Sequence, residues 1–390
     1  MTPTASLPLR AGLLGRARVM AGVGISMMLH DRARFFGTMM GVVFAVVLAA
    51  QQLGILFGLL QKNTMFVDAA GADVWIMPPG TELFQAGQRV SEASLQHART
   101  FPGVAFASPL VVAGGTIKKP DGGNEAVTLI GADPTTWLGG PWNLVAGTRD
   151  ALLQPDTLSF DDADRAKFGG LNLDSTREVN GHLVRVGALT WGLLPFGPSY
   201  VFGTVDLVRD LATAPPDRVD FVLVKAEAGV EPEQLAADLQ ASLPDLRVIT
   251  GARFGSDIVS TLLREQLGMS FGLSTSFGLA IGVIIVALSM FSSVIDNLRE
   301  FGTLKAIGCT NADLTVLVLT QSVAYALSGS LVGLWLVTGM AAGIRSAQLV
   351  VITPPWLVAT VPVVMLAMCL MAAVLALHRV RKLEPGMVFR

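Results

Sequence analysis

The stretch "NLREFGTLKAIGCT" (Asn297–Thr310) lies between two long apolar runs, yet it carries several charged side chains. It predicts a short helix that stops at Gly308, because a glycine just after a helix readily adopts the left-handed conformation that ends it. Thr310 or Asn311 can then cap a following helix, whose dipole favours the carboxylate of Asp313 in its first turn. The stretch therefore predicts a helix, a tight break and a second helix.

The short helix is predicted to be amphipathic. Leu298, Phe301, Leu304 and Lys305 recur at helical spacing, so an apolar stripe is flanked by charges. Such a helix can rest on lipid, or it can offer a docking surface to a partner in the same compartment. We favour docking, and we expect these residues to take part: Leu298, Arg299, Glu300, Phe301, Thr303, Leu304, Lys305 and Gly308.

Four windows are long and apolar enough to cross a membrane, which takes about 20 mostly apolar residues. The chain of 390 residues is 52% hydrophobic and 15% charged, whereas soluble domains carry about 25% charged residues. The first window is too long for a cleaved signal peptide. We expect a fold of four transmembrane helices with a large α+β extracytoplasmic domain, arranged as follows: an amphipathic N-terminal elbow (1–34), spans at 35–61, 269–295, 313–345 and 350–378, an outer domain (62–268), a coupling helix (296–312) and a C-terminal tail (379–390).

Basic residues gather on one side of the predicted membrane. Residues 62–268 carry 16 Lys and Arg against 25 Asp and Glu, a charge of −9, whereas the remainder carries 12 against 5, or +7. By the positive-inside rule, both termini and the segment 296–312 are cytoplasmic. The outer domain is then periplasmic or extracellular, on a chain in the inner (plasma) membrane. The arginine-rich tail is expected to lie on the inner surface, close to anionic headgroups.

The outer domain has the composition of an α+β fold. A helix capped by Ser91 is followed by an apolar strand that we expect to be broken near Pro109 and Gly114. The turn Pro120–Gly123 and the dipeptide Asn180-Gly181 predict two β-hairpins, since both are typical of tight turns. The segments "RVDFVLVKAE", "EPEQLAADLQASL" and "DLRVIT" predict strand, helix and strand before the chain returns to the membrane.

Several kinds of chemistry lack a signature in this sequence. It contains no GxxxxGK[ST] phosphate loop, and its four histidines are scattered. Its two cysteines lie outside the outer domain, so they are interpreted as packing residues. The acidic run at Asp161, Asp162 and Asp164 lacks the spacing of a calcium loop and is interpreted as a solvated turn. We therefore expect a non-catalytic chain without a cofactor or metal of its own, and no nucleic-acid partner.

The spans combine small residues with an absence of charge between the helix ends. A substrate path or proton relay through the spans would need such charges, so no wet channel is expected. Glycines recur at four-residue spacing, which lets membrane helices pack closely. The pairs are Gly37 and Gly41, Gly54 and Gly58, Gly268 and Gly272, Gly278 and Gly282, and Gly329 and Gly333.

The motif "LREFGTLKAIGCT", followed by an apolar span with Gln321 and "GSLVG", resembles the permease signature of the MacB/FtsX/LolC superfamily of ABC transporters. Within this motif, the sequence "EFGTLKAIG" is most similar to the DevC branch. In addition, "LIGADP" (Leu129–Pro134) resembles the outer domain of that superfamily. The layout of one span, a large outer domain and three further spans agrees along the whole chain.

This resemblance implies a mechanism and partners. A dimer of permease chains sits on a separate ABC ATPase dimer, which binds ATP and magnesium, and ATP-driven closure passes through the coupling helix to the outer domains. The DevC branch implies a homodimer with a periplasmic adaptor and a TolC-like outer-membrane channel, exporting lipids, glycolipids or other amphiphiles. Two alternatives remain: a LolC/LolE-like permease that releases lipoproteins, and an FtsX-like signalling protein that controls a cell-wall hydrolase.

Overall fold

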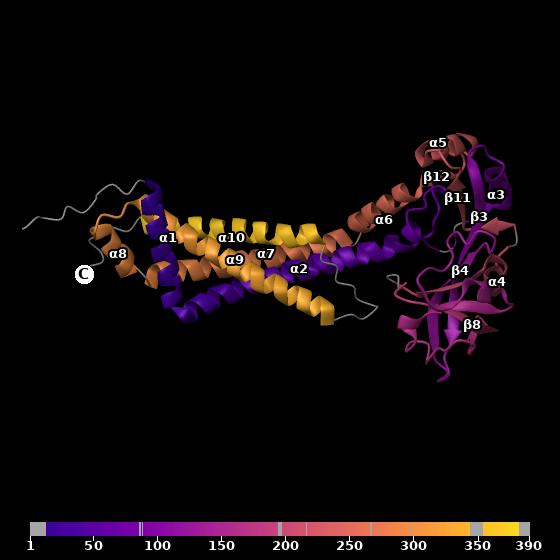
Figure 1. Cartoon of the computed structure of the whole chain (residues 1–390), viewed down its shortest axis with the longest axis horizontal. Coiled ribbons are helices and arrows are strands. Elements are labelled where there is room, and N and C mark those ends of the chain that lie inside the picture. Colours follow the sequence, from indigo (N-terminus) through magenta and orange to yellow (C-terminus); the bar gives the residue numbers. More distant parts are fainter. Residues whose placement is uncertain are drawn as a thin grey trace, which may run out of the picture. The chain divides into compact units, whose positions relative to one another are not determined.

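The computed structural model divides the chain into two compact units (Figure 1). It describes residues 13–85, 87, 89–193, 197–215, 217–265, 267–296, 298–343 and 354–381. The domain unit runs from Phe57 to Met269. The helical unit contains the helices α1 (Leu13–His30), α2 (Arg32–Ala69) as far as Leu56, α7 (Leu267–Asp296) from Ser270, α8 (Leu298–Ala306), α9 (Asn311–Gly343) and α10 (Pro355–Arg381).

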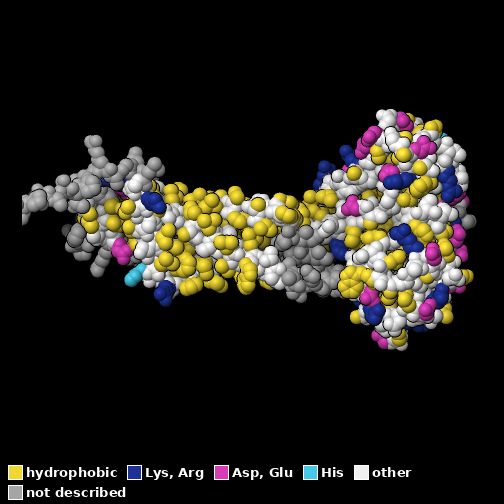
Figure 2. Space-filling model, viewed as in Figure 1, with side chains coloured by type: hydrophobic (Ala, Val, Ile, Leu, Met, Phe, Trp, Pro, Cys, Tyr) yellow, Lys and Arg dark blue, Asp and Glu magenta, His cyan; other side chains and the backbone are white. Residues whose placement is uncertain are grey.

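Within the described residues, four helices are long and apolar enough to cross a membrane: Phe35–Ala69, Leu267–Ile285, Asn311–Met340 and Pro355–Val374. Figure 2 shows apolar side chains along the helical unit, whereas charged side chains gather on the domain unit and at one end of the helical unit. The predicted fold class, four spans with an α+β domain between the first two, is confirmed. The first helix continues beyond the predicted residue 61 to Ala69, and residues 344–353 lie outside the described part of the chain.

Glycines allow α2 to pack closely against two neighbours. A Cβ at Gly329 or Gly333 of α9 would lie 2.5 Å from the Cγ1 atom of Val42 or Val46, respectively. At Gly282 of α7, a Cβ would lie 2.5 Å from a side-chain atom of Ala45. These separations are far below van der Waals contact, so only glycine fits. Among the described residues, Gly37 and Gly272 have no such neighbour within 4 Å.

The N-terminal helix α1 packs on α9. A Cβ at Gly24 would lie 3.0 Å from the carbonyl oxygen of Leu317. The buried amide of Gln321 donates to the carbonyl oxygen of Gly24 at 3.1 Å. Just after α1, the ring of Phe35 stacks on Tyr325 with 5.7 Å between centroids. The predicted elbow therefore has one face fixed to the helical unit.

A ten-stranded mixed sheet forms the centre of the domain unit, in the order β12-β1-β11-β3-β4-β9-β6-β8-β5, with β7 pairing β3 and β8. The pairs β4–β9 and β6–β8 are parallel, and a short ribbon joins β2 and β10. The strands are β1 (Val74–Met77), β2 (Val90–Ser91), β3 (Val104–Lys118), β4 (Asn124–Ala132), β5 (Leu144–Gly147), β6 (Thr157–Asp161), β7 (Thr176–Val179), β8 (His182–Thr190), β9 (Ser199–Thr204), β10 (Arg218–Val219), β11 (Phe221–Ala226) and β12 (Arg247–Thr250).

Helices cover both faces of this sheet. Successive side chains of a strand point to opposite faces, so Ile76 joins one core cluster and Trp75 the other. The first cluster includes side chains of three helices: α3 (Glu92–Arg99), α4 (Val205–Leu211) and α5 (Pro232–Ser242). The second includes side chains of the end of α2 and of α6 (Gly251–Glu265). Burial on both faces explains why β1 and residues 221–224 of β11 are continuous apolar runs.

The two predicted hairpins are confirmed, as β3–β4 and β7–β8. Asn180 and Gly181 both have positive φ angles, 50° and 85°, as a type I′ turn requires. The predicted break in the first strand is wrong, because β3 runs unbroken through Pro109. The carbonyl oxygen of Leu110 accepts from the β11 side. Pro109 therefore directs its missing N–H to the other side, where pairing with β4 begins only at Leu110.

Candidate functional site

The helix α8 ends in the left-handed stop that the sequence predicts. Gly308 has a φ angle of +105°, which side chains with a Cβ rarely adopt. The N–H of Cys309 donates to the carbonyl oxygen of Leu304 at 3.0 Å, and that of Ile307 donates to Thr303 at 3.0 Å. These bonds satisfy carbonyl groups at the end of α8, as in a Schellman motif.

A reciprocal cap starts the next helix immediately. The hydroxyl of Thr310 accepts from the N–H of Asp313 at 3.2 Å. In return, a carboxylate oxygen of Asp313 accepts from the N–H and the hydroxyl of Thr310, both at 2.8 Å. Such a capping box fixes the direction in which a helix starts. The α8–α9 corner, defined as residues 304–314, is thus closed by local bonds on both sides of Gly308.

The described residues of α8 differ in how far they are buried. Gly302 is buried, and Leu304 is half-buried against the core cluster of the helical unit. Glu300 and Thr303 are exposed, and Ile307 is 78% exposed. Leu304, which we expected in the docking surface, is therefore placed to anchor α8. The structure does not describe the side chains of Leu298, Arg299, Phe301 and Lys305.

In the domain unit, the end of α2 is inserted into a cluster of aromatic rings. Phe66 is fully buried, and the centroid of its ring lies 4.1 Å from that of Phe84, in a stacked arrangement. Phe254 and Ile258 of α6 belong to the same core cluster. Thus the segments that follow the first span and precede the second share one core. Other rings within 6.4 Å of Phe66 belong to Trp75, Trp142, Tyr200 and Phe202.

The acidic run is not the solvated turn that we expected, because Asp161 and Asp164 are fully buried. Asp161 accepts from the N–H groups of Gly192 at 3.2 Å and Leu193 at 2.7 Å, which fastens the loop after β8. Burial raises the pKa of Asp161, and these N–H bonds oppose that rise. Asp164 forms an ion pair with Lys167 at 2.8 Å. Both carboxylates therefore organise loops within the domain.

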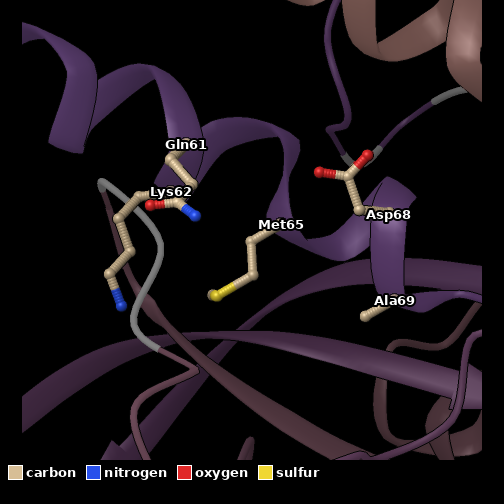
Figure 3. A pocket seen from close by; sticks show the side chains of 5 residues that line it. All are labelled: Gln61, Lys62, Met65, Asp68 and Ala69. Atoms are coloured by element: carbon tan, nitrogen blue, oxygen red, sulfur yellow. The ribbon is translucent and has the colours of Figure 1, made fainter. Parts of the chain in front are cut away.

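A pocket of about 400 Å³ lies along one face of α2 near its end. Its described lining consists of Gln61, Lys62, Met65, Asp68 and Ala69. Figure 3 shows the Lys62 ammonium and the Met65 sulfur on the same side, with the Asp68 carboxylate pointing away from them. The Lys62 ammonium donates to the carbonyl oxygen of Gly192 at 2.8 Å. This bond ties α2 to the loop that Asp161 holds.

The buried carboxyl group of Asp220 should make the stability of the domain depend on pH. Burial raises its pKa to about 6, against hydrogen bonds from the N–H groups of Val112 and Gly87 and the charge of Arg89. Because the folded pKa exceeds the unfolded one, the stability from this group is full below pH 4 and is lost as pH rises through 6. The difference between the folded and the unfolded pKa of Asp220 corresponds to roughly 3 kcal/mol of unfolding free energy.

We therefore expect the free energy of unfolding of the wild-type chain to fall relative to that of Asp220→Asn between pH 4 and 7. Denaturant titration of the full chain in detergent measures this difference. The exposed Asp245→Asn serves as the control and should run parallel to the wild type. A constant gap between wild type and Asp220→Asn across this range would contradict the assignment.

Together, the four spans and the α+β domain define a multi-pass membrane protein with an extracytoplasmic domain. Among the described residues, no group of three or more His, Cys, Asp or Glu side chains is placed to hold a metal ion. The features that remain for a function are the α8–α9 corner and the core shared by α2 and α6.

Comparison with known proteins identifies the family. Residues 35–242, more than half of the chain, match the MacB-like periplasmic core domain, and residues 272–385 match the FtsX-like permease C-terminal region. The chain therefore belongs to the MacB/FtsX-like ABC transporter permeases, a non-catalytic family whose members imply an ATPase partner.

Relatives and solved structures give the range of similarity. The chain is 24% identical over 357 residues to the uncharacterized ABC transporter permease Rv0072 of Mycobacterium tuberculosis, covering 90% of this chain and 93% of the relative. It is also 24% identical over 365 residues to Mb2592 of Mycobacterium bovis, with the same coverage. The periplasmic region of MacB from Actinobacillus actinomycetemcomitans has a TM-score of 0.37 at 16% identity, covering 48% of this chain and 93% of that one. The extracellular domain of the transporter YknZ from Gram-positive bacteria has a TM-score of 0.33 at 15% identity, covering 46% and 98%.

Proposed function

We propose that this chain is the permease subunit of an exporter that passes ATP-driven conformational change from a separate cytoplasmic ATPase to the extracytoplasmic domain. Both termini and α8 lie on the cytoplasmic side, as the basic flanks of the spans favour. Two chains work on an ATPase dimer that carries ATP and magnesium. The cargo is a lipid, glycolipid or other amphiphile, passed to an adaptor and an outer-membrane channel as in the DevC branch.

The observation that carries this proposal is the construction of α8. It is held between two spanning helices, and its Leu304 side chain packs against the helical unit whereas its Glu300 side chain is exposed. The left-handed stop and the capping box leave little freedom at the corner. A force applied to α8 would therefore reach α9 without being absorbed by a flexible loop.

The other end of the linkage supports the same function. The helix α2 is one continuous element of 38 residues, about 57 Å long at 1.5 Å per residue. Its last turns are fixed by buried Phe66 and Val67 in the core that also holds Phe254 of α6. Movement of the spans would thus be delivered to the sheet as movement of two packed helices.

Site-specific photo-cross-linking tests the docking step. A photoreactive residue at Ile307, which is 78% exposed at the end of α8, is expected to capture a chain with a GxxxxGK[ST] phosphate loop from native membranes. The matched control is a photoreactive residue at Trp335, which is 71% exposed on the spanning helix α9 and should capture no such chain. Mass spectrometry identifies the captured chain. Capture of the same ATPase from both positions, or from neither, would contradict docking through α8.

A further inference from the structure

The helix α1 has the orientation of a helix at a membrane surface. Figure 1 shows α1 crossing the end of the helical unit, while α7, α9 and α10 run along it. The same figure places α8 at this end. Since the long helices span the membrane, α1 lies close to the plane of one membrane surface, on the side where α8 is found.

The exposed surface of α1 carries large apolar side chains together with two arginines. Val19 is 60% exposed, Ile25 is 41% exposed and Leu29 is 53% exposed. Arg16 and Arg18 are exposed near the start of the same helix. The helix itself contains no acidic residue, and the carboxylate that interacts with Arg16 is that of Asp313 on α9. A helix with apolar side chains next to basic ones matches an anionic membrane surface, where acyl chains lie below charged headgroups.

Arg16 also lies near the α8–α9 corner. The thiol of Cys309 is partly buried there, and its pKa is raised by burial and by the carboxylate of Asp313. The guanidinium of Arg16 acts on the same thiol in the opposite direction. The first turn of α1 and the capping box of α9 therefore share one electrostatic environment. Behind them, the bond from Gln321 to Gly24 makes α1 and α9 move together.

We propose that the outward face of α1 is a selective binding site for anionic lipid headgroups, held by Arg16 and Arg18, and that this lipid steadies the α8–α9 corner. Guanidinium groups bind phosphate oxygens in a bidentate manner, which favours a phosphate headgroup over a neutral surface. Because α1 is bonded to α9, a lipid that restrains α1 also restrains the start of α9. The test below needs no ATPase, so its outcome is separate from that of the docking experiment.

Lipid selectivity is measured on the full chain in nanodiscs. A tryptophan introduced at Val19, which is 60% exposed and lies within one turn of both arginines, reports contact through quenching by brominated phosphatidylglycerol or brominated phosphatidylcholine, with the unmodified chain as the baseline. We expect phosphatidylglycerol to be preferred by about fivefold per arginine. Arg16→Gln with Arg18→Gln should remove the preference, and Arg16→Lys should keep most of it. Arg253→Gln, on α6 in the domain unit, is the matched control and should change nothing.

Hydrogen exchange tests the second part of the proposal. Amides of residues 310–318 are expected to exchange more slowly in phosphatidylglycerol nanodiscs than in neutral ones, and this difference should vanish in the double variant. Equal quenching by both lipids would overturn the binding site. Selective quenching with unchanged exchange would overturn the link to the corner. Loss of the preference on addition of inorganic phosphate would show a simple anion site and overturn the assignment to lipid.

Discussion

Phe66→Ala is expected to lower the free energy of unfolding of the domain unit by about 3–5 kcal/mol, the usual cost of removing a fully buried aromatic ring. Phe66 has no exposed surface, and its ring contacts the stacked ring of Phe84 and the edges of several others. Its removal leaves a cavity at the end of a rigid helix, which cannot collapse to fill it. For a domain of this size, the midpoint of thermal unfolding should fall by roughly 10 °C.

The control for this prediction is Phe106→Ala. Phe106 lies on β3 in the same unit, but its side chain is 40% exposed, so its removal should cost much less. Circular dichroism of the full chain in detergent follows both transitions. A midpoint for Phe66→Ala equal to that of Phe106→Ala would mean that the end of α2 is not held by the core.

This stability effect bears on function because the core also contains Phe254 and Ile258 of α6. The two segments that connect the sheet to the first and second spans are fixed in one cluster. A loosened cluster would let these helices move without moving the sheet. The Phe66→Ala variant should therefore show a weaker conformational response of the domain to ATP, even at temperatures where the domain remains folded.

The spans and the α8–α9 corner could be predicted because their signals are local. About 20 apolar residues identify a span by composition alone. The corner is determined by Gly308 and by the Thr310 and Asp313 pair, which lie within a few residues of one another. The hairpin at Asn180-Gly181 is equally local, since both residues have positive φ. In each case the decisive interaction lies within one or two turns of chain.

The features that could not be predicted depend on contacts distant in sequence. The sequence around Phe66 does not indicate which rings it contacts, because these lie as far along the chain as Phe202. The continuation "NTMFVDAA" of α2 mixes polar and apolar residues, although Phe66 and Val67 offered a weak signal of burial. The acidic run lacks the spacing of a calcium loop, which favours a solvated turn, but backbone N–H groups some 30 residues away hydrogen-bond to Asp161. Similarly, Leu304 belongs to an apolar stripe whose direction only the tertiary structure reveals.

The test of coupling is best made at two residues of the predicted docking surface, the exposed Glu300 and Phe301, whose side chain the structure does not describe. We expect Glu300→Arg and Phe301→Asp to abolish the response of the domain to ATP, while the chain still inserts and the ATPase remains active. Loss of an aromatic or charged anchor at an interface costs about 2 kcal/mol or more, roughly a thirtyfold loss of docking affinity. The effect should be large because the permease contains no phosphate loop of its own, and the proposed route for energy passes through α8.

The response is read from an environment-sensitive dye at Val145→Cys, a position that is 54% exposed in the domain unit. The native Cys309 and Cys369 are replaced beforehand, so that the dye labels only position 145. The chain is then reconstituted with the ATPase that the photo-cross-linking experiment identifies. Glu233→Arg, an exposed charge reversal on α5, is the matched control and should keep the full signal. A wild-type ATP response in both α8 variants would show that the force enters elsewhere, with α8 reduced to a helix that packs on lipid. If both variants lost the signal while Glu233→Arg kept it, α8 would be established as the element through which ATP hydrolysis reaches the domain.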